Sequence, residues 1–124
     1  MSFDIFLQDF SAESADRSAV IDPIVAALVD SSGPRIVTSD GTADVYGLAE
    51  SPVIGLMFNH VDGDAALDVI YEIALAAKWV VMPVGCAVCV PSEEIVDSIP
   101  EDLREMGFEL VRSGADILRL LRSS

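Results

Sequence analysis

Hydrophobic residues recur along the chain with two periods, and each period predicts a different kind of element. In residues 2–8, an apolar residue at every second position predicts a strand with one buried face. The second face of this strand is expected to be partly covered, because the apolar residue Phe6 lies among the polar residues of that face. Residues 22–33 carry a helical stripe. There Asp22 is placed to cap the helix, Pro23 suits its first position and Gly33 suits its end.

The segment "RIVTSDGTADVYGL", residues 35–48, predicts a β-hairpin. Two β-prone runs flank Asp40 and Gly41, a pair that tolerates the positive φ angles of a two-residue hairpin turn. A third β-prone run, residues 52–61, predicts a further strand of the same antiparallel meander.

A second amphipathic helix is predicted after this meander, with Asp62 or Asp64 as its N-terminal cap. Its buried stripe is predicted to contain Ala66, Val69, Ile70, Ile73, Ala74 and Ala77. On the opposite side, Asp64, Asp68 and Glu72 follow one another at four-residue spacing. They predict an exposed acidic row.

The remaining chain predicts one interrupted strand over residues 79–90, short helices between Ser92 and Gly107, a strand reaching Arg112 and a helix from Ala115. Together the elements follow the order β-α-β-β-β-α-β with a helical C-terminal tail. This order predicts an α+β fold in a single domain spanning residues 1–124, with a mostly antiparallel sheet and helices packed on one face.

The apolar stretch "WVVMPVGCAVCV", residues 79–90, has three interpretations: a membrane span, a redox or metal site at Cys86 and Cys89, or a buried strand. Lys78 and the change of period at Trp79 argue against a span. On a strand, side chains three positions apart point to opposite faces, which argues against a disulfide. A turn at residues 83–85 would change that geometry. The sequence favours two buried thiols.

Charge is the most unusual global feature, because 21 acidic residues stand against 7 basic ones for a net charge of −14. Residues 1–77 hold 13 of these acids and only two bases, Arg17 and Arg35. Nucleic acid binding is excluded, since it requires Lys and Arg to displace counterions from phosphates. The charge either keeps the protein soluble or docks a basic partner.

The leading hypothesis is a non-enzymatic binding protein whose acidic face engages a basic protein partner, in an immunity or regulatory role. Tyr46, beside Asp44, could anchor that partner or pack across the strands. The predicted partner-binding residues are Asp40, Asp44, Tyr46, Asp62, Asp64, Asp68 and Glu72.

Two alternatives remain. A small-ligand or metal-dependent enzyme would be centred on the polar loop of residues 59–64, with Asn59, His60, Asp62 and Asp64 as its site. The spacing of a calcium loop is not met, because residue 66 is Ala. A homodimeric structural module is the second alternative. No catalytic residue, metal ligand or cofactor is assigned.

The N-terminal segment "MSFDIFLQDF" has no basic region and is interrupted by acids, so no secretory signal is recognised. With two cysteines in the chain, a cytoplasmic location without membrane association is expected.

The segments "MSFDIFLQDF", "DGTADVYG" and "RSGADI" resemble, in the same order, an uncharacterised family of small bacterial proteins. This resemblance implies no particular activity. In size, acidity and α+β pattern the chain is also similar in type to immunity proteins, which block bacterial toxins by binding them tightly. That second similarity carries no residue motif.

Overall fold

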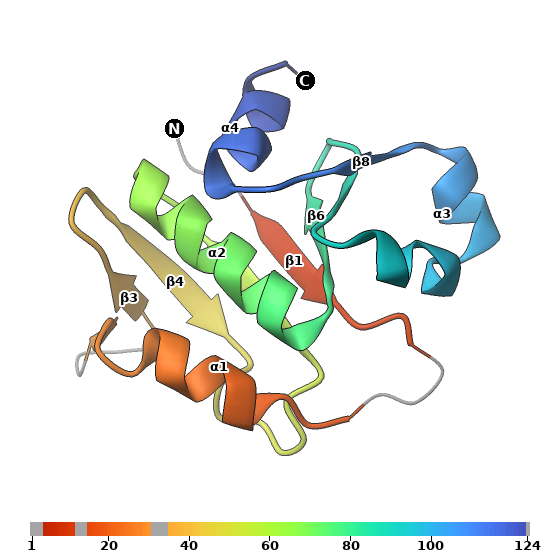
Figure 1. The fold of residues 1–124 in the computed structure, drawn as a ribbon. Coiled ribbons are helices and arrows are strands. Elements are labelled where there is room, and N and C mark those ends of the chain that lie inside the picture. Colours follow the sequence, from red (N-terminus) through yellow and green to blue (C-terminus); the bar gives the residue numbers. More distant parts are fainter. Residues whose placement is uncertain (1–3, 12–14, 31–34, 124) are drawn as a thin grey trace.

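The computed structural model describes residues 4–11, 15–30 and 35–123, which form one mixed sheet with helices (Figure 1). The eight strands follow the order β2-β3-β4-β5-β1-β6-β7-β8. They are β1 (Ile5–Gln8), β2 (Val29–Asp30), β3 (Arg35–Val37), β4 (Thr42–Tyr46), β5 (Gly55–Asn59), β6 (Val80–Pro83), β7 (Val88–Val90) and β8 (Phe108–Leu110). Every pairing is antiparallel except that of β7 with β8. The predicted α+β class is confirmed.

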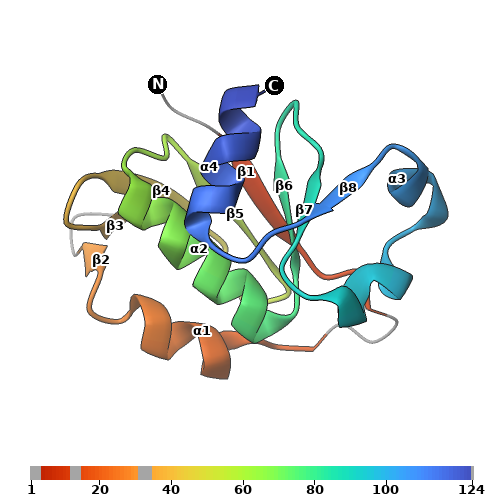
Figure 2. The same ribbon diagram turned by 45° about the horizontal axis from the view of Figure 1, so that its top comes forward.

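The helices are α1 (Ser18–Val25), α2 (Asp64–Ala77), the 3-10 helix η1 (Glu93–Ser98), α3 (Glu101–Glu105) and α4 (Gly114–Ser123). Figures 1 and 2 show α1 and α2 side by side on the same face of the sheet, with α4 against α2. This face carries the main core, which includes Ile5, Phe58, Ile70 and Trp79, all without exposed surface. We call it the inner face of the sheet.

A second, smaller core lies on the outer face of the sheet, over β6 and β7. Val80, Val88 and Val90 alternate with Val81 and Cys89 of the main core, so they point away from α2. They pack against Ile95 and Ile99, in and directly after η1. No described element covers the outer face of β3, β4, β5 and β1 in the same way.

Helix α1 begins at Ser18 rather than at Pro23 and ends at Val25, before strand β2, so both ends of the predicted helix were wrong. The carboxylate of Asp16 accepts hydrogen bonds from the Ser18 backbone N–H at 3.2 Å and from the Ser18 hydroxyl at 2.7 Å. It also accepts one from the Val53 N–H at 2.8 Å, which ties the helix start to the β4–β5 connection. Pro23 lies inside the helix, Asp22 is not its cap, and Gly33 lies outside the described residues.

The predicted β3–β4 hairpin is confirmed, but its turn is shifted by one residue. Val37 pairs with Thr42, and the Thr38 N–H donates to the Gly41 carbonyl at 2.9 Å, so Ser39 and Asp40 form the turn. Gly41 does not have a positive φ. It is required instead for close approach, since a Cβ there would collide with the carbonyl oxygen of Asp62.

The turn of this hairpin caps helix α2. The Asp40 carboxylate accepts hydrogen bonds from the backbone N–H groups of Asp64, at 2.9 Å, and Ala65, at 3.2 Å. The predicted caps, Asp62 and Asp64, make no side-chain cap bond. A helix cap is predicted from residues next to the helix in the chain, whereas the capping group here comes from 24 residues away. The cap fixes the hairpin to the start of α2.

The predicted buried stripe of α2 is nearly complete. Ala66, Ile70, Ile73, Ala74 and Ala77 are buried, while Val69 is partly buried. Leu67 is also buried, in the region of α2 that faces α4. At Gly114, the first residue of α4, a Cβ would lie 2.5 Å from the Asp68 backbone nitrogen, so glycine allows the two helices to approach closely.

The stretch of residues 79–90 forms a hairpin of β6 and β7, not the single interrupted strand that the sequence predicted. The turn uses Gly85 at a φ of 82°, which glycine adopts without strain. Val81 pairs with Cys89, and the two cysteines are not joined in a disulfide. Cys89 is buried as predicted, whereas Cys86 is only partly buried. Burial raises the pKa of Cys89 to about 12, so this thiol stays protonated near neutral pH. Among the described helices, none is long and apolar enough to cross a membrane.

Replacing Asp40 by Ala is expected to lower the free energy of unfolding by about 1 kcal/mol, because two N–H groups at the start of α2 lose their acceptor. Asp62→Ala is the matched control. Asp62 is an exposed acid of the same junction that caps nothing, and its loss is expected to change stability by less than about 0.5 kcal/mol. Urea unfolding measures both. Equal effects would contradict the long-range cap.

Cys89 is expected to resist alkylation in the folded protein. In a Cys86→Ser variant, iodoacetamide at about pH 8 should leave the remaining thiol unmodified until denaturant is added, since only an accessible thiolate reacts. Mass spectrometry counts the adducts. Rapid modification of the folded variant would instead favour the redox interpretation of the cysteine pair.

Candidate functional site

The residues of the predicted acidic face do not form one surface. Asp44 and Tyr46 alternate along β4 with the buried residues Ala43 and Val45, so they lie on the outer face of the sheet. Asp68 and Glu72 are exposed on α2, which packs against the inner face. The sheet therefore separates these two groups.

The other three acids of that prediction lie where the β3–β4 turn meets the start of α2. The Asp40 carboxylate is engaged as the helix cap. The backbone N–H of Asp62 donates to the Thr42 carbonyl at 2.9 Å, and the side chains of Asp62 and Asp64 are exposed. This junction joins the hairpin to the helix.

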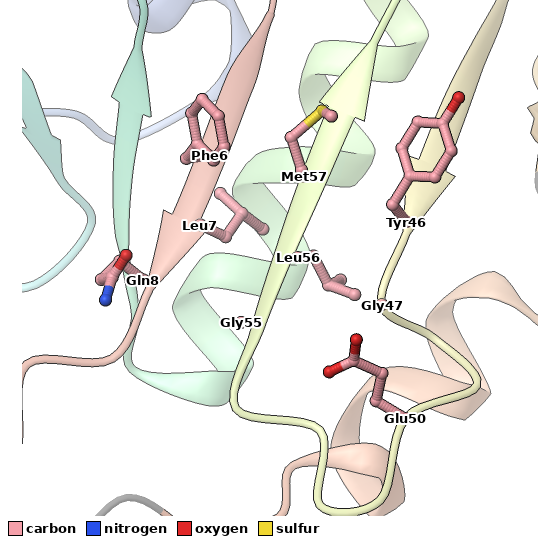
Figure 3. Close-up of a pocket in the computed structure, with 9 residues that line it drawn as sticks. All are labelled: Phe6, Leu7, Gln8, Tyr46, Gly47, Glu50, Gly55, Leu56 and Met57. Carbon is pink, nitrogen blue, oxygen red and sulfur yellow. The ribbon is translucent and has the colours of Figure 1, made fainter.

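A row of apolar side chains crosses the outer face at one level of the sheet. Tyr46 of β4 pairs with Met57 of β5, Met57 pairs with Phe6 of β1, and Phe6 pairs with Met82 of β6. Figure 3 shows three of them on adjacent strands, with α2 behind the sheet. Tyr46 is 46% exposed and Phe6 is 44% exposed. We call these four residues the outer row.

A hollow of about 300 Å³ lies beside the outer row. On β5, Gly55 falls two positions before Met57 and thus on the same face, where it has no side chain to place against Gln8, its partner on β1. Figure 3 shows the Glu50 carboxylate next to the backbone of Gly47 and Gly55. The hollow is lined by Phe6, Leu7, Gln8, Tyr46, Gly47, Glu50, Gly55, Leu56 and Met57.

Asp44 joins His60 and Arg35 at the other side of the outer row. Its carboxylate lies 2.9 Å from Nδ1 of His60 and 3.5 Å from Nε of Arg35. The hydrogen bond with His60, followed by the charges of His60 and Arg35, lowers the pKa of Asp44. Arg35 is the only basic residue of strands β3, β4, β5, β1 and β6, and it is paired.

The residues of the alternative ligand site do not converge on a common point. Asn59 pairs with Asp44 across two strands, and His60 contacts the same aspartate. Asp64 instead receives the Asp40 cap through its backbone N–H. Within the described part of the chain, no three His, Cys, Asp or Glu side chains are grouped so that they could hold a metal ion. These polar groups hold β4, β5 and α2 together.

Sequence reasoning missed the outer row and the hollow, apart from Tyr46. The signal was present, because Phe6 and Met57 occupy the alternate positions of strands whose other positions are also apolar. In an antiparallel sheet with one solvated face, these positions are usually polar. The sequence carried no signal for Gly55 and Glu50, since they come together only in the folded sheet, through the pairing of its strands and the turn after β4.

No protein-family model, no curated protein and no solved structure gives a significant match to this chain. The resemblances to a family of small bacterial proteins and, in type, to immunity proteins therefore stay predictions. The fold and the surface define an α+β protein whose sheet is covered by helices on its inner face and only over β6 and β7 on its outer face.

Replacing His60 by Ala is expected to raise the pKa of Asp44 toward 3.8, because the largest cause of its lowering is removed. In the native protein, the stability that ionised Asp44 contributes is present above its unfolded pKa and is lost as pH falls through the lower folded pKa. Carboxyl NMR titration measures the change. Asp16 is the control, since its pKa is lowered by Ser18 and Val53 and should not move. An unchanged pKa of Asp44 in this variant would contradict its pairing with His60.

Proposed function

We propose that this chain is a non-enzymatic binding protein that docks a basic protein partner on the outer face of its sheet. The outer row carries the proposal: Tyr46, Met57 and Phe6 lie side by side on three uncovered strands, and the two aromatic rings are nearly half exposed. Met82 continues the row to β6, where it packs against the edge of the second core. Contiguous exposed apolar surface of this kind marks interaction sites. Tyr, Phe and Met are enriched at protein interfaces.

Charge selects the kind of partner. Asp4, Asp44 and Glu50 surround the outer row, and the single basic residue of these strands, Arg35, is neutralised by Asp44. The whole chain adds a net charge of −14, which attracts a basic protein and raises its rate of association. A partner with basic residues around an apolar anchor complements this surface.

A second copy of the chain fits this face less well. In a symmetric dimer the same patch meets itself, so Asp4, Asp44 and Glu50 would meet the same acids of the other subunit. Like charges brought together at an interface oppose binding. A different, basic protein is therefore the proposed occupant, and tight binding to it in the cytoplasm would serve an immunity or regulatory role.

Truncation of the outer row is expected to remove partner binding. In affinity capture from lysate of the source organism, Phe6→Ala with Tyr46→Ala should lose a basic protein that the native chain retains. Binding to the identified partner should weaken more than about tenfold, the effect of removing aromatic anchors at an interface centre. Titration calorimetry with the purified partner measures the affinity, and circular dichroism checks the fold.

The matched control neutralises the acids on the other side of the sheet, with Asp64→Asn, Asp68→Asn and Glu72→Gln. These exposed side chains lie on α2, so affinity should change less than about threefold, mainly through the association rate. Equal retention of the partner by the Phe6 and Tyr46 variant, or its loss from the α2 variant alone, would contradict the proposal.

A further inference from the structure

The floor of the hollow is bare because two glycines lie under it. Gly47 has a φ of 111°, and a Cβ there would lie 2.9 Å from the Gly55 carbonyl oxygen. A Cβ on Gly55 would lie 3.1 Å from the Leu7 carbonyl oxygen. Both positions therefore favour glycine, and the exposed backbone leaves space beside the outer row.

Two aromatic rings and a methionine side chain form one wall of the hollow. Phe6 and Tyr46 stand on either side of Met57, and Figure 3 shows this row at one end of the hollow, with Gly47, Gly55 and Glu50 toward the other end. The faces of exposed aromatic rings attract cations. The polarisable thioether of Met57 adapts to a group packed against it.

A single charge faces the hollow. Among the described residues that line it, Glu50 is the one acidic residue and none is basic. A turn hydrogen bond from the Glu50 N–H to the Gly47 carbonyl, at 3.2 Å, holds this residue next to the glycine floor. Within the described residues, no Lys or Arg forms an ion pair with Glu50. Its carboxylate is free to accept an external cation.

We propose that this hollow receives an arginine side chain of the basic partner, an inference that rests on the proposed function and specifies its anchor. The N–H groups of its guanidinium donate to the Glu50 carboxylate, while its aliphatic stem packs toward Met57 and Tyr46. An arginine suits this open site better than a lysine, because the guanidinium is more weakly hydrated and can bind a carboxylate through two parallel N–H groups.

Other occupants fit the hollow less well. An anionic ligand would meet Glu50 and no cation. A volume of about 300 Å³ is at the lower limit of small-molecule sites, which suits a side chain rather than a cofactor. A second copy of this chain offers on the same strands only Arg35, which Asp44 already binds.

A peptide titration tests this inference on the full chain. The probe is the capped tripeptide Gly-Arg-Gly, and its control carries citrulline, which has nearly the same shape without the charge. The arginine peptide should shift the amide NMR signals of Gly47 and Gly55 saturably. The citrulline peptide, and the corresponding lysine peptide, should bind about fivefold or more weakly. Equal binding of all three would overturn the inference.

Two variants with the same change of charge locate the binding. Glu50→Gln should reduce arginine binding to the level of citrulline, whereas Glu72→Gln, on α2 behind the sheet, should leave it within about twofold. Arginine binding that survives Glu50→Gln, or that shifts signals only outside the hollow, would overturn the inference.

The peptide result is separable from the proposed function. Suppose that the hollow does not bind the arginine peptide while the variant with Phe6→Ala and Tyr46→Ala still loses the partner. In that case the arginine anchor is wrong, and the docking face is still supported. If that double variant keeps its partner, the docking face itself is wrong, whatever the peptide does.

Discussion

The unequal covering of its sheet is the constraint on which the rest of this protein depends. Helices α1 and α2 bury the inner face, and α4 packs on α2. On the outer face, the residues after β7 cover only β6 and β7. A strand with apolar residues on both faces needs cover on both sides, and β1 and β5 have it in the described structure on only one. The outer row is the consequence of that arrangement.

Local patterns predicted most of the fold because the elements concerned are amphipathic over short distances. The stripe of α2 and the alternation in β4 are properties of neighbouring residues. Contacts between distant segments were not predictable in this way. Asp16 links the start of α1 to the Val53 N–H, and Asp40 caps α2 from the turn of the β3–β4 hairpin. The sequence predicted neither of these roles.

The candidate site shows the same division between what the sequence could and could not reveal. Asp44 and Tyr46 were predicted together and do lie on one face, because alternation along a strand decides it. Asp68 and Glu72 were added to that face on charge alone, and the sheet separates them from it. Gly55, Glu50 and Phe6 come together only through the pairing of β1 with β5 and the turn after β4.

Hydroxyl-radical footprinting tests most directly whether the outer row is an open docking face. In the isolated protein, Phe6 and Tyr46 should be oxidised readily, while Phe58 and Trp79, which are fully buried, should be protected. Addition of the captured partner should then protect Phe6 and Tyr46. If Phe6 and Tyr46 are already as protected as Phe58 in the isolated chain, or stay fully reactive in the complex, the outer row is not the docking face.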